Sequence, residues 1–393
     1  MHDTFSNDNQ VLDHVRSRIQ HRRGATLVLS VFLMFGLFSF VAFSVDIGYL
    51  AQSRAEIQRT ADAAAMAGCW ELYAGMENGN GYQGSQTAAR LAAADMAVLN
   101  PVCRSGPTLD SSAQSQDVQI GYFANPRIET LSNDSSQPFF GVQVKVSRTA
   151  DKNGEIPFFF GKIFGDQGIP METTARAIMA QRISGFSLPP TSSETIDVLP
   201  FALDLQTWLG LFSGCVSDNY AFDATDSTVS SGHDGIGEVN LYPQGTGSPG
   251  NRGTVDIGGA NNSTNDIARQ ILYGISAQDL VDLGKPLTIA PNVELTLNGD
   301  TGISAGVKDE LESIIGQKRC IPVFSSVCGN GNNATYTIVR WVGVRILNVK
   351  LTGKMSGKQL IVQPAPLVAR NAVIATDGGT SSDFVLSPVI LAR

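Results

Sequence analysis

Histidine and charged side chains are scarce in this sequence. Three of its four histidines lie within the first 21 residues, so His233 alone serves the rest of the chain. Only 16% of the 393 residues are charged, and the formal net charge is -8. Scarce histidine argues against catalysis that uses imidazole as a base, and the acidic balance provides no basic field to attract phosphates. We therefore expect no nucleic-acid partner.

Motifs for cofactors and metals are also missing. The Gly-rich runs 250–259 and 329–333 have neither the lysine spacing of a phosphate-binding loop nor the fingerprint of dinucleotide binding. The cysteines form no Cys-x-x-Cys pair and have no histidines nearby. Residues 223–227 (DATDS) faintly resemble the Asp-x-Ser-x-Ser metal motif of von Willebrand A domains but lack the doubled serine, so we interpret them as turn chemistry. We predict no catalytic residue, no cofactor and no metal, and hence no enzyme.

One long apolar run is present, at residues 25–45 (ATLVLSVFLMFGLFSFVAFSV), and it carries no charge. About 20 such residues suffice to cross the hydrocarbon core of a bilayer as a helix. Arginines at positions 16, 18, 22 and 23 precede the run, and Asp46 follows it. Because positive charge stays on the cytoplasmic side, we expect a cytoplasmic basic tail at 1–24, a transmembrane helix at 25–45 in contact with the lipid bilayer, and an exported body from Asp46 onward.

Two kinds of processing are alternatives to a permanent anchor. Residues 42–44 (AFS) offer small side chains at the spacing of a signal-peptide cleavage site, but the sequence around them stays apolar where a signal peptide becomes polar. The junction between Gly24 and Ala25 is similar to that of type IV prepilins, whose fifth residue is usually Glu, whereas here it is Leu29. We therefore expect an uncleaved, bitopic protein.

The residues after the apolar run favour a helix that continues beyond the membrane. Residues 46–75 are rich in Ala, Gln, Glu and Arg and contain no proline. Apolar and small side chains recur at three- and four-residue spacings, which places them on one stripe of the helix. This stripe either covers the body of the same chain or packs against similar helices of partner subunits. The residues predicted to contact a partner helix are Ile47, Leu50, Ile57, Ala61 and Ala64.

The segment from Arg22 to Cys69 resembles the N-terminal signature of TadE/TadG-like proteins of Flp (Tad) pilus assembly. The matching features are two arginines and a glycine before the span, an Asp-Ile-Gly step at 46–48, Arg54, and an Ala-Asp-Ala-Ala-Ala run at 61–65. A looser similarity at 142–180 covers the strand, phenylalanine-rich turn and returning strand of that family. The resemblance implies a protein of the bacterial inner (cytoplasmic) membrane with a periplasmic or extracytoplasmic body. Its implied partners are other pilus-assembly membrane proteins or pilin-like subunits.

The exported body is predicted to have an α+β fold in two domains. The first, at 46–183, is pilin-like in outline and combines the long Ala-rich helix with a second helix and a small sheet. The Gly-, Ser- and Pro-rich segment 184–193 is predicted as a linker, and a second mixed α+β domain follows at 194–393. We expect helices at 86–99, 263–273, 276–283 and 307–315, strands at 116–122, 140–148, 293–297, 335–351 and 359–363, and a turn at 298–302.

All five cysteines lie after the apolar run, where disulfides can persist. Their odd number leaves at least one of them unpaired. Cys69 and Cys103 lie near the outer ends of two predicted helices, where a bridge would lock the helical hairpin. Cys320 and Cys328 could close a short loop. The spacing of the cysteines leaves their connectivity open.

The function that follows from the resemblance is a membrane-anchored, non-enzymatic role in the assembly or anchoring of an Flp/Tad-type pilus. One alternative is a membrane-tethered adhesin or envelope-binding module whose recognition residues lie in the C-terminal half, after Pro190. Another is an envelope hydrolase, which would need carboxylates that converge in one cleft. His233, in a Gly-rich loop, is interpreted as a solvated histidine.

Overall fold

The computed structural model describes residues 7–77, 81–127, 131–214, 216–242, 252–259, 263–291, 293–300, 303–329, 333–375 and 382–392. Helices and strands are both abundant in it, which confirms the α+β fold class. The chain divides into two compact units. Unit 1 comprises Met1–Ala61, Ala97–Thr108 and Val146–Thr173, and unit 2 comprises Asp62–Met96, Leu109–Lys145 and Thr174–Arg393.

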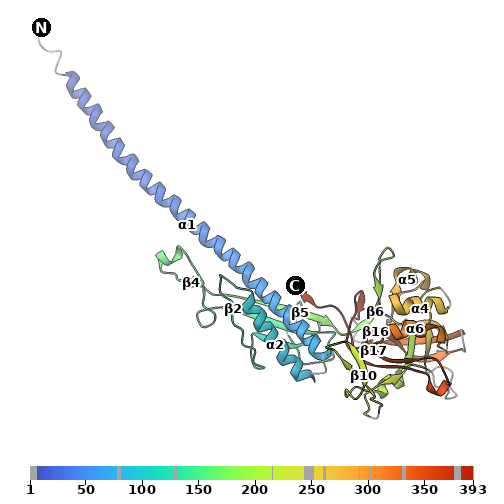
Figure 1. The fold of residues 1–393 in the computed structure, drawn as a ribbon. Coiled ribbons are helices and arrows are strands. Elements are labelled where there is room, and N and C mark those ends of the chain that lie inside the picture. The colour runs from blue at the N-terminus through green and yellow to red at the C-terminus, as the bar shows by residue number, and fades with distance from the viewer. Residues whose placement is uncertain are drawn as a thin grey trace, which may run out of the picture. The chain divides into compact units, whose positions relative to one another are not determined.

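Helix α1 (Asn7–Glu77) is the longest element and is drawn in blue in Figure 1. Its 71 residues contain no proline, so nothing in the sequence interrupts the hydrogen-bond ladder. Among the described residues, it is the one helix long and apolar enough to cross a membrane. The side chains of its apolar run are exposed, with Phe32 at 72% and Phe40 at 75%. The prediction that the apolar segment continues as one long helix is confirmed.

Unit 1 combines the N-terminal part of α1 with the segment 97–108 and a small hairpin. The hairpin pairs β3 (Ile156–Pro157) with β4 (Gly168–Ile169), and the 3-10 helix η1 (Gly161–Phe164) lies between these strands. Polar side chains join the segments to one another. Thr60 Oγ1 donates to the carbonyl of Asn100 at 2.8 Å, and Arg148 Nη1 donates to the carbonyl of Val102 at 2.8 Å. Backbone carbonyls of the 97–108 segment thereby gain partners.

In unit 2, helix α2 (Gly81–Leu99) packs against the C-terminal part of α1, as the predicted helical hairpin requires. Two glycines of α1 allow this close approach. A Cβ on Gly68 would lie 3.0 Å from the carbonyl oxygen of Ala89, and a Cβ on Gly75 would lie 2.9 Å from Cα of Ser85. Next to the pair is a four-stranded sheet in the order β1 (Val118–Phe123), β2 (Phe139–Arg148), β5 (Met171–Ala180) and β23 (Ile390–Ala392).

The rest of unit 2 is built on an eight-stranded sheet. Its order is β11 (Val239–Asn240), β18 (Gln359–Pro364), β17 (Ala334–Lys350), β15 (Leu295–Asp300), β12 (Arg252–Val255), β8 (Phe201–Asp204) and β16 (Lys318–Cys328), with β21 (Ser382–Asp383) beside β17. Because β16 also pairs with β17, the strands from β17 to β16 close into a ring. Alternate side chains enter two cores: Phe201 and Leu203 belong to one, and Ala202 belongs to the other.

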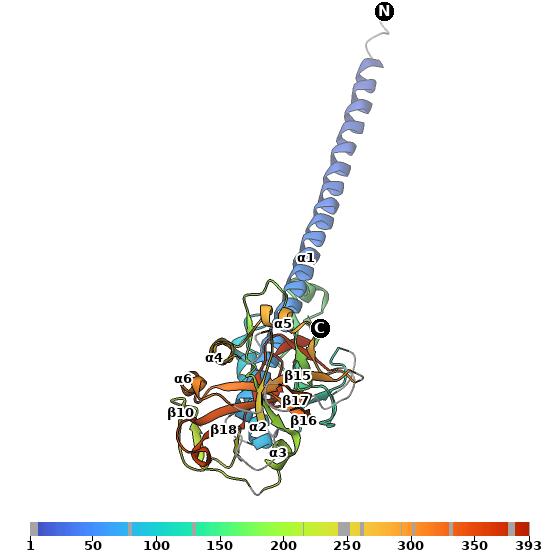
Figure 2. The same cartoon turned by 90° about the vertical axis from the view of Figure 1, so that its right-hand side faces the viewer.

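Short helices accompany this sheet: α3 (Leu205–Gly210), α4 (Thr264–Tyr273), α5 (Ala277–Leu283) and α6 (Lys308–Ser313), with η2 (Ala305–Val307) before α6. Helices α4, α5 and α6 lie near one another in both views (Figures 1 and 2). Ser263 and Ser276 accept hydrogen bonds from the backbone N–H groups of Asp266 and Asp279, so each serine caps its helix. The predicted helices at 263–273 and 276–283 are therefore confirmed.

The remaining elements are short. They are β6 (Ile183–Phe186), β7 (Thr195–Ile196), β9 (Tyr220–Asp223), β10 (Thr228–Ser231), β13 (Ile275–Ser276), β14 (Leu287–Thr288), β19 (Leu367–Val368), β20 (Ala372–Ile374), β22 (Val385–Leu386) and η4 (Met355–Gly357).

Two predicted connections differ from the structure. The turn expected at 298–302 was wrong in its first half, because residues up to Asp300 continue β15 and pair with both β12 and β17; residues 301 and 302 lie outside the described part. The segment predicted as a linker begins in a strand, since Ser184–Phe186 belong to β6, which pairs with β14 and β20. Only residues 187–194 of that region lack helix or strand.

Candidate functional site

The first charged residue after the apolar run, Asp46, binds the backbone of a loop that is distant in sequence. Its carboxylate accepts backbone hydrogen bonds from Phe159 at 2.8 Å, from Phe160 at 3.2 Å and from Gly161 at 2.9 Å. These donors lie at the start of η1, in the β3–β4 loop, which is drawn in green beside α1 in Figure 1. Only 8% of Asp46 is exposed. One buried side chain thus fastens a loop more than a hundred residues away in sequence.

Two opposing effects act on the Asp46 carboxyl group. Burial raises its pKa, and the three backbone N–H groups lower it by stabilising the carboxylate. The hydrogen bonds prevail, so the pKa of Asp46 lies below its ordinary value. Asp46 is therefore a carboxylate at neutral pH, and it carries a negative charge at the level where the apolar run ends.

The loop that Asp46 binds, Phe158–Phe164, is mostly apolar and exposed. Phe159 is 59% exposed, Ile163 78% and Phe164 80%, and η1 contains no buried residue. The ring of Phe159 meets the ring of Tyr49 edge-on, with centroids 4.8 Å apart. The loop is therefore attached to α1 on one side and presents phenylalanine and isoleucine to the surroundings on the other.

A second polar contact of α1 in unit 1 involves Cys103. Glu56 Oε2 accepts the backbone N–H of Cys103 at 2.7 Å, and Ser53 Oγ lies 3.0 Å from Cys103 Sγ. Cys103 and Arg104 have positive φ angles of 53° and 67°, so the chain turns tightly at this point. Two effects raise the pKa of Tyr49 to about 12. The larger is a hydrogen bond with Cys103, and the smaller is burial.

The residues predicted to contact a partner helix differ in their exposure. Ile57, Ala61 and Ala64 are buried within the chain, at 1%, 0% and 0% exposure. Ile47 is 50% exposed, and Leu50 is half-buried. Within this fold, accessible surface for a partner helix is therefore found at the N-terminal end of the stripe, next to the apolar run. The partner contact itself stays a prediction.

The four described cysteines are free thiols. Cys320 and Cys328 stand at opposite ends of β16, where a rise of about 3.3 Å per residue separates their Cα atoms by roughly 26 Å. A disulfide needs a Cα separation under about 7 Å, so these two cannot bridge in this fold. Burial raises the pKa of the Cys69 thiol to about 12, and this thiol has a backbone partner at Val142, whereas the thiol of Cys103 meets Ser53. Cys215 lies outside the described residues.

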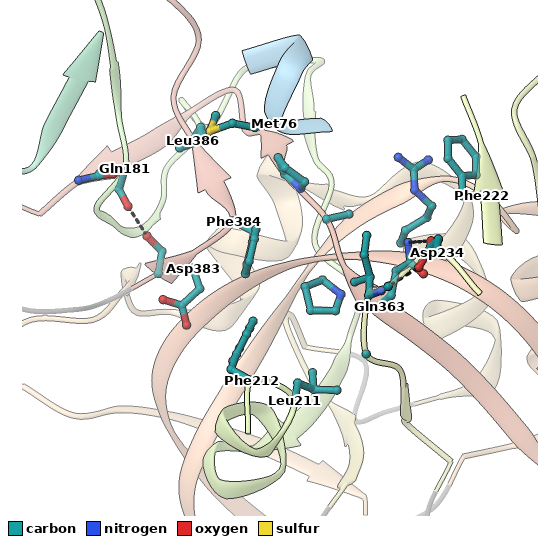
Figure 3. A pocket seen from close by; sticks show the side chains of 18 of the residues that line it. Met76, Gln181, Leu211, Phe212, Phe222, Asp234, Gln363, Asp383, Phe384 and Leu386 are labelled. Carbon is teal, nitrogen blue, oxygen red and sulfur yellow. Dashed lines mark hydrogen bonds between the residues drawn. The ribbon is translucent and has the colours of Figure 1, made fainter. Parts of the chain in front are cut away.

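Unit 2 contains a cleft of about 1570 Å³ (Figure 3). Phe212 and Phe384 stack across it with ring centroids 6.0 Å apart, and Phe212 is 55% exposed. Phe384 has a φ of 58°, which is costly for an aromatic residue. The neighbouring Asp383 accepts from Trp208 Nε1 at 2.8 Å and from Arg340 Nη1 at 2.5 Å. On the opposite wall, the guanidinium carbon of Arg345 lies 3.4 Å above the Phe222 ring.

The polar loops singled out in the sequence have ordinary turn geometry. Asp223 accepts the N–H of Thr225, and Asp226 accepts the N–H of Thr228, in the turn between β9 and β10. The side chain of His233 is 81% exposed, so the interpretation as a solvated histidine is confirmed. These residues do not form a catalytic constellation with one another.

Two family models match the N-terminal part of the chain. The model of Flp pilus-assembly TadE/G-like proteins matches residues 24–95, and the model of Tad-like Flp pilus-assembly proteins matches residues 63–177. Together the two models cover residues 24–177, which are called the Tad segment because of this similarity. The predicted resemblance is thereby confirmed, and the match extends beyond the helices into β1, β2 and most of β5. Searches of curated proteins and of solved structures find no match.

The Tad segment contains both Asp46 and the phenylalanine-rich loop, but their contact was missed in the sequence. In the sequence, Asp46 is the first charged residue after the apolar run, and residues 158–160 belong to the phenylalanine-rich turn of the family resemblance, so nothing joins the two. One available signal was the occurrence of a carboxylate directly after the apolar run together with a conspicuous Phe-Phe-Phe-Gly turn. The cleft of unit 2 gave no comparable signal, because its lining residues come from segments far apart in sequence.

Proposed function

We propose that this protein is a membrane-anchored, non-enzymatic component of Flp pilus assembly. The observation that carries the proposal is the match of residues 24–177 to two families of Flp pilus-assembly proteins. The exposed apolar run of α1 supports an anchor in the bilayer. The arginines before the run support a cytoplasmic N-terminus and an exported body in the bacterial inner membrane, periplasmic or extracytoplasmic.

An anchored body contributes to assembly by staying at the membrane surface and by contacting other proteins there. Confinement to the membrane raises its effective concentration for other membrane-bound pilus components or pilin-like subunits. The membrane end of the predicted contact stripe, Ile47 and Leu50, offers a lateral surface to a neighbouring helix, because it is accessible and directly follows the span. The other members of the stripe are buried within the chain and are not accessible to a partner: Ile57, Ala61 and Ala64.

Paired asparagine substitutions on α1 test this contact. The double variant Ile47→Asn and Leu50→Asn places polar amides on the proposed surface, whereas Gln52→Asn with Ala55→Asn places them on exposed positions on the other side of the helix. Both pairs add two asparagines to the same helix, so their effects on helix propensity are similar. We expect the first pair to reduce co-purification with pilus components and piliation, and the control pair to leave both unchanged. Equal results for the two pairs would reject the contact surface.

The cleft of unit 2 favours a second candidate, a membrane-tethered adhesin or envelope-binding module. An exposed aromatic pair beside Asp383 and Arg340 is a mostly apolar site with few convergent polar groups, which is typical of binding clefts. Phe212→Ala removes one wall of this pair, and Val293→Ala, at an apolar residue 67% exposed outside the cleft, is the control. Loss of surface attachment with normal piliation in Phe212→Ala would favour this candidate. Loss of pili on deletion of the residues after Pro190 would favour assembly.

A further inference from the structure

We propose that the β3–β4 loop is a second membrane contact of this protein. In this inference, which rests on the proposed membrane anchor, Phe159, Phe160, Ile163 and Phe164 enter the interfacial region of the bilayer that α1 crosses. The loop would lie in the leaflet on the side of the exported body. The protein then contacts the bilayer at two places, through the apolar run of α1 and through the loop that Asp46 binds beside it.

The exposure of the loop is the first support. Four large apolar side chains are exposed within six residues: Phe159 at 59%, Phe160 at 38%, Ile163 at 78% and Phe164 at 80%. Such clusters on a protein surface mark sites that contact another apolar phase. η1 has no buried residue, so these side chains do not pack into a core of their own.

The position of the loop identifies lipid as that phase. Asp46 directly follows the apolar run, and its carboxylate contacts the loop backbone at 2.8 to 2.9 Å. The loop is therefore held at the level where the helix leaves the hydrocarbon core. Val45 and Ile47, at 44% and 50% exposure, continue the exposed apolar surface of the span up to this level. Aromatic side chains are enriched at this depth of a bilayer.

The polar groups of the loop fit the same depth. The side chain of Lys162 is exposed between the apolar residues, and its ammonium group can reach lipid headgroups while its stem stays among apolar side chains. Asp46 satisfies three backbone N–H groups that would otherwise be desolvated near lipid. Most backbone N–H groups of the loop thus have an acceptor within unit 1.

The loop is also ordered before it meets lipid. Beyond the Asp46 contact, Gly165 has a φ of 101° and donates to the carbonyls of Gly161 and Lys162, which ends η1. Ile156 pairs with Ile169 at the base of the loop. An ordered loop loses less conformational entropy on insertion. With two contacts in one leaflet, rotation of α1 about its own axis is restricted, and this fixes which side of the helix faces neighbouring proteins.

Photo-crosslinking in intact membranes tests the inference with the full chain. Benzoyl-phenylalanine is introduced at Phe164, at Leu33 in the apolar run and, as a control, at Val293, which is 67% exposed in unit 2. After irradiation, lipid adducts are measured by mass spectrometry. We expect lipid adducts at Phe164 and Leu33 and at least about tenfold fewer at Val293. Adducts at Leu33 with only protein or solvent products at Phe164 would overturn the loop contact and leave the anchor standing. Absence of lipid adducts at Leu33 would overturn the anchor and the loop contact together.

Removal of the Asp46 contact gives a second readout. In Asp46→Ala the loop backbone loses its acceptor, so the lipid adduct yield at Phe164 should fall by at least about tenfold, given the size of charged hydrogen bonds. The yield at Leu33 should stay constant and serves as the control for insertion. Asp46→Asn keeps one acceptor oxygen and should give an intermediate yield. Equal Phe164 yields in all three proteins would contradict the role of Asp46 as the fastening residue.

Discussion

Individual side chains on α1 join segments that are distant in sequence. Asp46 binds the loop at 159–161, and Glu56 binds Cys103, in both cases through backbone N–H groups. A carboxylate that accepts a backbone N–H forms a charge-assisted bond, which is stronger than a neutral one. Unit 1 contains few buried apolar side chains compared with unit 2. Its stability should therefore depend on such bonds more than on a hydrophobic core.

The Glu56 bond gives a pH-dependent prediction. The backbone N–H of Cys103 lowers the pKa of Glu56 from 4.5, so the bond adds stability above pH 4.5, and this stability is lost as the pH falls through the lower, folded-state pKa. Glu56→Gln should lower the free energy of unfolding at pH 7 by about 1 kcal/mol. The difference from wild type should shrink at acidic pH. Chemical unfolding in detergent at both pH values measures it, and a difference that is independent of pH would contradict the assignment.

The reactivity of the cysteine thiols should follow their burial. Cys69 and Cys320 are buried, and burial raises the pKa of both thiols, whereas Cys328 is exposed. In the folded protein without reductant, we expect a maleimide to modify Cys328 rapidly and the two buried cysteines only after unfolding. Peptide mass spectrometry after timed labelling measures this. A Cys328 that reacts only after reduction would show that it forms a disulfide, contrary to the free thiol of the structure.

At the scale of elements, the α1–α2 contact depends on two glycines. A Cβ on Gly75 would lie 2.6 Å from Ser85 Oγ and 2.9 Å from its Cα, so backbone must move to admit it. Gly75→Ala should destabilise the protein by ~1–3 kcal/mol through overpacking, although alanine favours helix by about 1 kcal/mol. Gly48→Ala is the matched control, since no atom lies within 4 Å of its Cβ. Thermal unfolding compares the two, and a Gly75→Ala protein at least as stable as wild type would contradict the packing.

Elements with local signals were predicted well from the sequence. Ser263 with Gly274 and Ser276 with Gly284 delimit α4 and α5, because caps are set by neighbouring residues. Strands β17 and β18, predicted at 335–351 and 359–363, likewise follow from two apolar runs, and the structure pairs them. By contrast, β23 joins β5 across more than two hundred residues, and no local pattern indicates that partner. The strand character of Ser184–Phe186 was hidden by the Gly and Ser that made the segment resemble a linker.

At the scale of the whole molecule, the family resemblance and the long apolar helix were readable because both depend on contiguous residues. The apolar run is continuous in sequence, and the Tad features follow it in fixed order. The candidate sites were not readable, since the Asp46 contact and the cleft with Phe212 and Phe384 arise from long-range folding. For the predicted contact stripe, periodicity identified one face of α1, but only the fold separates its exposed members, such as Ile47, from its buried ones, such as Ala61.

The most direct test of the account is protease accessibility in spheroplasts of cells that carry an N-terminal and a C-terminal epitope tag on the full chain. We expect protease added outside to remove the C-terminal tag and the body, while the N-terminal tag stays protected on a short membrane-bound fragment. Permeabilised cells, in which both tags are removed, are the control. A C-terminal tag that survives until the membrane is opened would contradict an anchored, outward-facing body.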